Sequence, residues 1–238
     1  MRYLLALDEG TTSARAIVFD ETGAERAAAG HPIHCAFPRE GWVEQDAEQI
    51  WEAQLEAGRV ALQRARVAPD QVVALGITNQ RETTILWERD TGRPAAPAIV
   101  WQDRRTADFC EQLRRDGLEA EITERTGLLA DPYFSGTKLR WLLDSAPGLR
   151  ERAAAGELLF GTVDCWLLYK LTRGRVHATD ASNASRTLLF HLEERQWDGR
   201  LLGMLQVPPI QARHSAFRTP HSALRTPHSA LGCGYAAL

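Results

Sequence analysis

Residues 3–20 form two apolar segments joined by a short polar turn, and this pattern constrains the fold more than any other part of the chain. The first segment, residues 4–7, ends at Asp8, and the second covers residues 16–19. Gly10 favours a tight turn, and three hydroxyl residues follow it, namely Thr11, Thr12 and Ser13. The pattern predicts a β-hairpin whose turn presents N–H and O–H donors beside a carboxylate.

This polar turn has two interpretations. Donors of this kind bind phosphate, and Asp8 is suited to the Mg²⁺ that accompanies nucleotide phosphates. The alternative is an ordinary hairpin with a polar turn, which the turn taken alone favours. A Walker phosphate-binding loop is excluded, because no Gly-x-x-x-x-Gly-Lys-Ser/Thr motif occurs and the only lysines are Lys138 and Lys170.

The residues after the hairpin alternate between helical and strand patterns. A long helix is expected after Asp46, with Gln49 completing a capping box. The apolar run 72–78 predicts a strand buried on both faces, and residues 183–190 also predict a strand. Further strands are predicted at 25–34, 83–87, 98–101 and 158–161, and helices at 104–114, 118–127, 135–144 and 163–171. The succession predicts an α/β domain.

Charge and cysteine usage narrow the functional classes. The 28 Lys and Arg residues and 31 Asp and Glu residues give a net charge of −3, which does not favour nucleic acid or an anionic membrane as a partner. The four cysteines lie singly, without the spacing of a zinc site or a disulfide framework. Asp8 comes too early for a signal peptide, and no apolar run approaches membrane-spanning length. A cytoplasmic protein without membrane insertion is therefore expected.

A tandem repeat of seven residues occupies positions 214–234, with the copies HSAFRTP, HSALRTP and HSALGCG. Two copies end in proline, which prevents a single helix from aligning the histidines His214, His221 and His228 as metal ligands. A histidine metal array is the alternative. We expect a disordered tail without function, translated from a DNA repeat or a shifted reading frame.

Six further segments resemble collinear motifs of one enzyme family. They are GWVEQD at 41–46, GITNQRETTILWERDTG at 76–92, IVWQDRRT at 99–106, TGLLADPYFSGTKLRWLLD at 126–144, GELLFGTVDCWLLYKLT at 156–172 and TDASNASRTLLF at 179–190. Together with the hairpin, they resemble the glycerol kinases of the FGGY carbohydrate kinase family. The resemblance implies a ribonuclease-H-like (actin-like ATPase) α/β domain, with a mixed sheet and flanking helices. It also implies MgATP-dependent phosphorylation of glycerol to glycerol 3-phosphate.

The resemblance also implies roles for individual residues. Contacts to the nucleotide phosphates fall to Thr11, Thr12, Ser13 and Arg15, and Asp8 would organise Mg²⁺ through water. Contacts to glycerol fall to Arg81, Glu82, Trp101 and Tyr133. An arginine donates to hydroxyl oxygens and a glutamate accepts from hydroxyl protons, so this pair suits a triol. The alternatives are a surface ion pair for Arg81 and Glu82 and a core position for Trp101.

Other polar residues near these motifs are expected to be structural. Asp103 is interpreted as the cap of the helix that follows it, and Asp164 as a residue that opens a helix. Inter-strand packing is expected for Asn183, Ser185 and Arg186. The family often has Gln in place of Glu9 and Ser in place of Ala14, and both departures are expected to weaken nucleotide contacts modestly.

No catalytic residue is assigned. The resemblance implies a general-base aspartate in a Gly-Asp-Gln-Gln motif of a second domain, and the sequence has no such motif. Residues 1–208 are expected to form the N-terminal kinase domain and residues 209–238 the tail. We expect little or no turnover from this chain alone, and a homo-oligomer only in the full-length family. The alternatives are a non-catalytic polyol- or nucleotide-binding module and an inactive product of a frameshifted gene.

Overall fold

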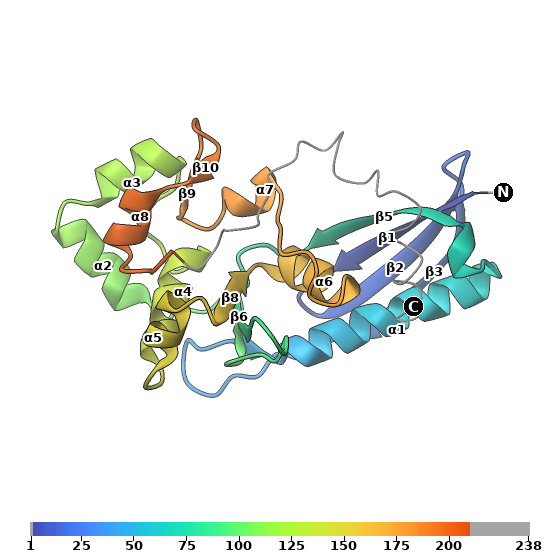
Figure 1. Ribbon diagram of the computed structural model, residues 1–238, viewed down its shortest axis with the longest axis horizontal. Helices are drawn as coiled ribbons and strands as arrows, with labels where there is room; N and C mark the ends of the chain where they lie inside the picture. Colours follow the sequence, from blue (N-terminus) through green and yellow to red (C-terminus); the bar gives the residue numbers. More distant parts are fainter. Residues whose placement is uncertain (1, 210–238) are drawn as a thin grey trace.

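A mixed four-stranded sheet forms one end of the computed structural model, which describes residues 2–209 (Figure 1). Its strands, in spatial order, are β3 (Glu25–Pro32), β2 (Ser13–Asp20), β1 (Tyr3–Glu9) and β5 (Val72–Asn79). β1 pairs antiparallel with β2 and parallel with β5. The predicted N-terminal hairpin is confirmed, with Asp8 opposite Arg15 across the two strands. The expected mixed sheet with flanking helices is confirmed as well.

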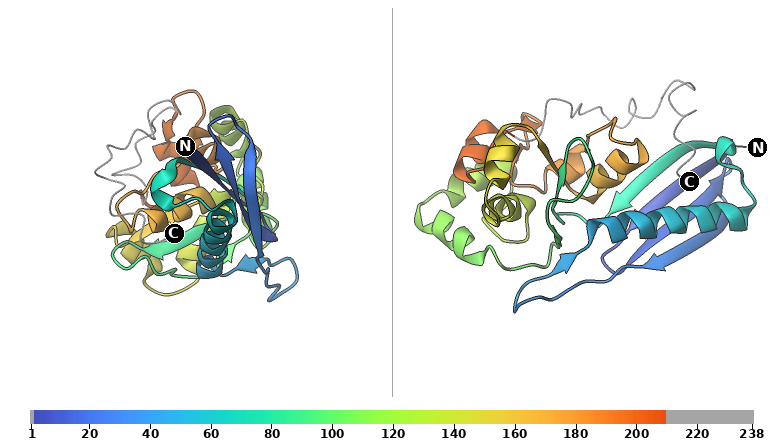
Figure 2. Two further views of the ribbon diagram at one scale, coloured as in Figure 1. Left: turned by 90° about the vertical axis from the view of Figure 1, so that its right-hand side faces the viewer. Right: turned by 60° about the horizontal axis from the view of Figure 1, so that its bottom comes forward.

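The long helix α1 (Ala47–Ala65) packs along one face of this sheet (Figure 2). Ile50, Ala57 and Ala61 repeat at helical spacing and are buried, so the helix presents a continuous apolar stripe to the sheet. Asp46 caps the helix by accepting from the Glu48 N–H at 2.9 Å, as expected. The predicted capping box is wrong, because the Gln49 side chain accepts from the N–H of His34 instead.

The strand predicted at 72–78 exists, but its burial differs from the prediction. β5, which follows a short 3₁₀ turn η1 (Pro69–Gln71), lies at the edge of the sheet beside β1. Its residues are half-buried or exposed, and Val73 is 45% exposed. The expectation of burial on both faces is therefore wrong. A continuous apolar run does not distinguish a central strand from an edge strand that a helix covers on one side.

Two short strand pairs connect the sheet to the rest of the molecule. β4 (Glu44–Gln45) pairs with β7 (Ala98–Ile99), and β6 (Ile85–Glu88) pairs with β8 (Leu158–Gly161). Helix α6 (Val163–Leu171) follows β8, as the sequence predicts. Trp87 of β6 and Trp166 of α6 are fully buried, with ring centroids 5.3 Å apart, so this junction has a continuous aromatic core.

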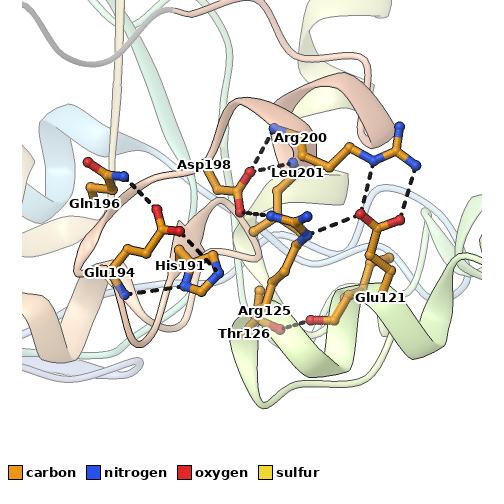
Figure 3. Close-up of polar contacts among 10 residues, drawn as sticks. Glu121, Arg125, Thr126, His191, Glu194, Gln196, Asp198, Arg200 and Leu201 are labelled. Atoms are coloured by element: carbon orange, nitrogen blue, oxygen red, sulfur yellow. Dashed lines mark hydrogen bonds and ion pairs between the residues drawn. The ribbon is translucent and has the colours of Figure 1, made fainter.

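The other end of the molecule is a helical lobe (Figures 1 and 2). It contains α2 (Ala107–Arg115), α3 (Glu119–Thr126), α4 (Ser135–Asp144), α5 (Leu149–Ala154), α8 (Gly199–Met204) and the hairpin of β9 (Phe190–His191) and β10 (Gln196–Trp197). Arg125 of α3 pairs with Asp198 at 2.8 Å and with Glu121 at 3.1 Å, and Arg200 also pairs with Glu121 (Figure 3). Asp198 caps α8 as well, so this network joins α3 to α8.

The strand predicted at 183–190 is largely wrong. Residues Ala181–Ala184 form the short helix α7, and strand pairing begins only at Phe190. Asp180 accepts from the N–H groups of Ser182 and Asn183, which supplies the helix cap. A local cap therefore outweighs the apolar pattern of the segment.

The C-terminal tail lies outside the described residues. The histidine repeat at 214–234 and the disorder predicted for it belong to that part of the chain, and the expected domain boundary lies at its edge. Of the helices between residues 2 and 209, none has both the length and the hydropathy that a bilayer crossing requires.

A candidate polyol and phosphate site

An open pocket of about 330 Å³ lies where β1 and β5 end. Six of the residues predicted for the site line it: Asp8, Thr11, Arg81, Glu82, Trp101 and Tyr133. Glu9, Gly10, Asn79 and Gln80 complete its lining. The hydroxyl turn and the arginine–glutamate pair, which are about 70 residues apart in the chain, therefore face one shared cavity. The parallel pairing of β1 with β5 brings them together, because it places both strand ends at the same edge.

The turn after β1 is closed and tied to the opposite wall of the pocket. The Gly10 N–H donates to the Ser13 carbonyl at 2.9 Å, and a Cβ on Gly10 would lie 3.2 Å from that oxygen. The indole N–H of Trp101 donates to the Thr11 hydroxyl at 2.9 Å. Thr12 and Ser13 are exposed and do not line the pocket. The core interpretation of Trp101 is incomplete, because its polar edge contacts the turn.

Asp8 and Arg15 form an ion pair at 2.7 Å across the hairpin. Their side chains are 35% and 59% exposed, so solvent screens the pair. Among residues 2–209, no group of three or more His, Cys, Asp or Glu side chains is placed to hold a metal ion. The Asp8 carboxylate alone still fits Mg²⁺, which keeps most of its water ligands and uses one or two carboxylates.

Glu82 adopts an unusual backbone conformation at the centre of the pocket wall. Its φ is +64°, a left-handed conformation that costs free energy in a residue with a side chain. Two hydroxyls, from Thr84 and Ser135, donate to its carbonyl oxygen at 3.1 Å each. Its side chain is only 3% exposed. Strain of this kind persists only where surrounding contacts hold the residue in place, and such residues cluster at functional sites. The backbone of Glu82 therefore distinguishes it from the other pocket residues.

Arg186 contacts Glu82 directly, and this contact was not predicted from the sequence. The Arg186 Nε donates to Glu82 Oε1 at 2.6 Å, and its guanidinium lies 5.8 Å from the Tyr133 ring centroid. The expected inter-strand packing role is wrong, because the segment around Arg186 is not a strand. The sequence carried no signal for this contact, because 104 residues separate the arginine from the carboxylate.

The wall opposite the turn is aromatic. The ring centroids of Trp101 and Tyr133 lie 5.4 Å apart at an angle of 59°. Arg81 lines the pocket and is exposed. The pocket therefore presents an apolar face beside an arginine and a carboxylate, a combination that can orient a short polyhydroxylated carbon chain.

Beneath the pocket, a chain of side-chain amides supports the turn. Gln80 Nε2 donates to Gln45 Oε1 at 2.8 Å and to Glu9 Oε1 at 3.2 Å. Gln45 Nε2 donates to the Thr11 carbonyl at 2.7 Å. The Thr83 hydroxyl donates to Gln80 Oε1 at 2.9 Å. The network therefore runs from the strand end beside Glu82 to the hydroxyl turn, and it fixes one relative to the other.

Glu9 belongs to this buried network. It is 0% exposed, and its Oε2 has no hydrogen-bond partner among the described residues. Burial raises the pKa of Glu9 to about 8, and the charge of Asp8 acts in the same direction. At neutral pH the side chain is therefore mostly an uncharged acid. A negative charge on Glu9 is therefore present mainly at higher pH.

Asp103 and Asp164 have structural contacts. Asp103 accepts from the Val43 N–H at 2.6 Å and pairs with the buried Arg105 at 2.8 Å. The expected helix cap is wrong, because Thr106 holds the N-cap position of α2. Asp164 lies in the first turn of α6, as expected, and accepts from the Thr162 and Thr179 hydroxyls. Burial raises the pKa of Asp164 to about 6, although those hydroxyls act against the shift.

In a sequence comparison, residues 3–214 match the family described as the FGGY family of carbohydrate kinases, N-terminal domain. Glycerol kinase from Thermus brockianus is 62% identical over 208 residues, which are 87% of this chain and 42% of the relative. Glycerol kinase from Ralstonia nicotianae is 59% identical over 209 residues, with 88% and 42% covered. The chain thus spans about 42% of the length of these relatives.

Structure comparison agrees with the family match. The crystal structure of Plasmodium falciparum glycerol kinase with ADP matches with a TM-score of 0.82 and 27% identity, over 93% of this chain and 46% of that one. A xylulose kinase from Lactobacillus acidophilus also has a TM-score of 0.82, at 19% identity and over 98% and 45% of the two chains, so it supports the actin-like ATPase fold alone. On this evidence, the chain belongs to the FGGY family of carbohydrate kinases and carries their N-terminal domain.

Proposed function

We propose that this chain supplies the polyol-binding part of a glycerol kinase, which transfers a phosphoryl group from ATP to glycerol. The observation that carries the proposal is the shared pocket, in which the Thr11 turn and the Arg81–Glu82 pair face one cavity. The glycerol kinase names of the relatives at 52–62% identity support glycerol as the substrate.

Arg81 and Glu82 would bind the hydroxyls of glycerol in complementary roles, one as a hydrogen-bond donor and the other as an acceptor. The arginine donates to hydroxyl oxygens, and the carboxylate accepts hydroxyl protons. Arg186 occupies Glu82 Oε1, so the second carboxylate oxygen is the one that would accept from the substrate. Tyr133 would add a phenolic hydroxyl, and Trp101 would cover the carbon chain.

The turn would bind the phosphates of ATP. Thr11, Thr12, Ser13 and the backbone N–H groups are donors to phosphoryl oxygens, and Arg15 is a permanently charged partner. Asp8 would hold Mg²⁺ through water, and the Asp8–Arg15 pair would then separate, so that each contacts its own ligand. When bound, the ion neutralises phosphate charge. These residues position the two substrates; we assign no general base within the 238 residues.

We also propose a cytoplasmic location. Cys35, Cys110 and Cys165 are free thiols among the described residues, which fits a reducing compartment. Homo-oligomerisation remains a prediction for the full-length family.

Isothermal titration of the 238-residue chain with glycerol tests the proposal. We expect saturable binding that Glu82→Gln weakens at least tenfold, because the buried carboxylate acceptor is lost. Glu56→Gln on the exposed face of α1 is the matched control and should bind as the unaltered chain does. Absence of glycerol binding in the folded, unaltered chain would contradict the proposal.

A coupled ATP–glycerol assay separates this proposal from a non-catalytic binding module. We expect little turnover from the chain alone, and phosphorylation when it is produced together with the remaining portion of a relative such as the Thermus brockianus enzyme. Binding of glycerol without turnover in that mixture would favour the non-catalytic module.

A further inference from the structure

Lys138 has a buried amine for which the proposed chemistry has no use. Its side chain is 0% exposed, and it lies in the first half of α4, directly behind the pocket wall. None of the ion pairs formed among residues 2–209 includes it. Burying an ammonium group without a carboxylate partner is unfavourable, so its hydrogen bonds must offset part of that cost.

Those hydrogen bonds go to the segment that carries Tyr133. Lys138 Nζ donates to the Tyr133 carbonyl at 2.5 Å and to the Phe134 carbonyl at 3.2 Å. Both carbonyls precede α4, and the protonated form of the amine makes stronger bonds to them than a neutral donor would. The Lys138 side chain therefore holds the two peptide groups that flank Phe134, and through the Tyr133 carbonyl it fixes the direction in which the Tyr133 ring leaves the chain.

The same helical turn also holds Glu82. Ser135, three residues before Lys138, donates its hydroxyl to the Glu82 carbonyl at 3.1 Å, where the backbone is left-handed. The first turn of α4 thus contacts two elements of the pocket wall, one through Ser135 and one through Lys138. Neither side chain lines the pocket.

We propose that Lys138 is a positioning residue for polyol binding, which fixes Tyr133 beside Trp101 and opposite the hydroxyl turn. This inference depends on the proposed function, because it concerns the glycerol subsite. It differs from a general stabilising role in one respect: loss of the ammonium should weaken glycerol binding more than it disturbs folding.

The surroundings of Lys138 couple it to the charge of the pocket. Burial lowers the pKa of Lys138 to about 7, and the negative charges of Glu82 and Asp103 act against this shift, with smaller effects of Cys110 and Asp131. Three arginines compensate the carboxylates of this group: Arg186 on Glu82, Arg105 on Asp103 and Arg104 on Asp131. A substitution that removes the charge of Glu82 should therefore change the pKa of Lys138.

The first test compares Lys138→Met with Lys170→Met. The chain has only these two lysines, and Lys170 pairs with Glu48 at 2.8 Å, away from the pocket. By isothermal titration, we expect Lys138→Met to bind glycerol at least tenfold more weakly and Lys170→Met to bind as the unaltered chain does. Unchanged glycerol affinity in a folded Lys138→Met chain would overturn the inference while leaving the proposed function intact.

The second test needs no substitution of Lys138, so it applies even if that variant does not fold. Selective ¹⁵N labelling of lysine in the unaltered chain gives two side-chain amine signals, which Lys170→Met assigns. We expect saturating glycerol to shift the Lys138 signal and to leave that of Lys170 in place, and Glu82→Gln to lower the pH midpoint of the Lys138 signal. Glycerol binding that moves neither signal would overturn the inference, whereas no glycerol binding would overturn the proposed function.

Discussion

Glu9 offers a quantitative test of how the buried network responds to charge. Its carboxyl is fully buried, accepts one hydrogen bond from Gln80 and has one oxygen without a partner among residues 2–209. The substitution Glu9→Gln keeps the shape of the side chain and removes its ability to ionise. We predict that this substitution stabilises the protein and that the gain grows with pH.

The magnitude follows from the pKa of Glu9, which burial raises from 4.5 to about 8. Between these two values the unfolded chain has released the proton and the folded chain retains it, so the free energy of unfolding falls as the pH rises. Each pH unit between the two pKa values lowers the free energy of unfolding by about 1.4 kcal/mol. The loss of stability caused by Glu9 is therefore ~3 kcal/mol at pH 7 and up to ~5 kcal/mol at pH 8 and above. Glu9→Gln avoids this loss.

Urea unfolding followed by tryptophan fluorescence, at pH values from 4 to 9, measures the effect. We expect the difference in free energy of unfolding between Glu9→Gln and the unaltered chain to be small at pH 4, to increase through neutral pH and to level off above about pH 8. Glu56→Gln, at an exposed position of α1, should show no comparable trend. A difference that does not depend on pH would refute the reasoning, because it would place Glu9 in an environment where it ionises normally.

Three further substitutions test individual contacts. Trp101→Phe removes the hydrogen bond to Thr11 and keeps the apolar face, so we expect stability to fall by only ~1 kcal/mol while calorimetric glycerol affinity falls several-fold. Arg186→Met leaves the Glu82 carboxylate buried without its cation; because the arginine is 29% exposed, we expect a loss of ~1–3 kcal/mol in urea unfolding, and Arg195→Met, with an exposed side chain, should lose little. Although burial opposes it, hydrogen bonds from Arg125 and from backbone N–H groups lower the pKa of Asp198. Asp198→Asn should therefore lower the thermal unfolding midpoint at pH 7, and the difference should shrink as the pH falls through that lowered pKa; an equal difference at pH 3 would contradict the assignment.

Local sequence signals predicted the elements that depend on neighbouring residues. The hairpin of β1 and β2 follows from two apolar runs around Gly10, and β8 and α6 were predicted with their observed bounds. The edge position of β5 was not predictable from its apolar run, because edge and central strands differ in what lies beside them. The strand predicted at 183–190 failed because the Asp180 cap formed a helical turn there.

The same division applies to the site. Glu82, Trp101 and Tyr133 came from motifs and do line one pocket. Arg186 and Lys138 were missed, since their importance lies in contacts that the fold creates: one with Glu82, 104 residues away, and one with the carbonyl of Tyr133. Neither contact follows from residue type or spacing, because an arginine or a lysine can donate to many different acceptors in a folded protein.

The indole N–H of Trp101 gives the most direct test of a shared pocket, because it bonds to the turn and lies beside Tyr133. The NMR signal of this indole proton can be assigned in the ¹⁵N-tryptophan-labelled chain by comparison with Trp101→Phe, and it can be followed while glycerol is added. We predict that glycerol shifts this signal with a saturable dependence on concentration, and that Glu82→Gln shifts the saturation to at least tenfold higher glycerol. Saturable glycerol binding that leaves the Trp101 signal unchanged would place the polyol elsewhere and contradict the account.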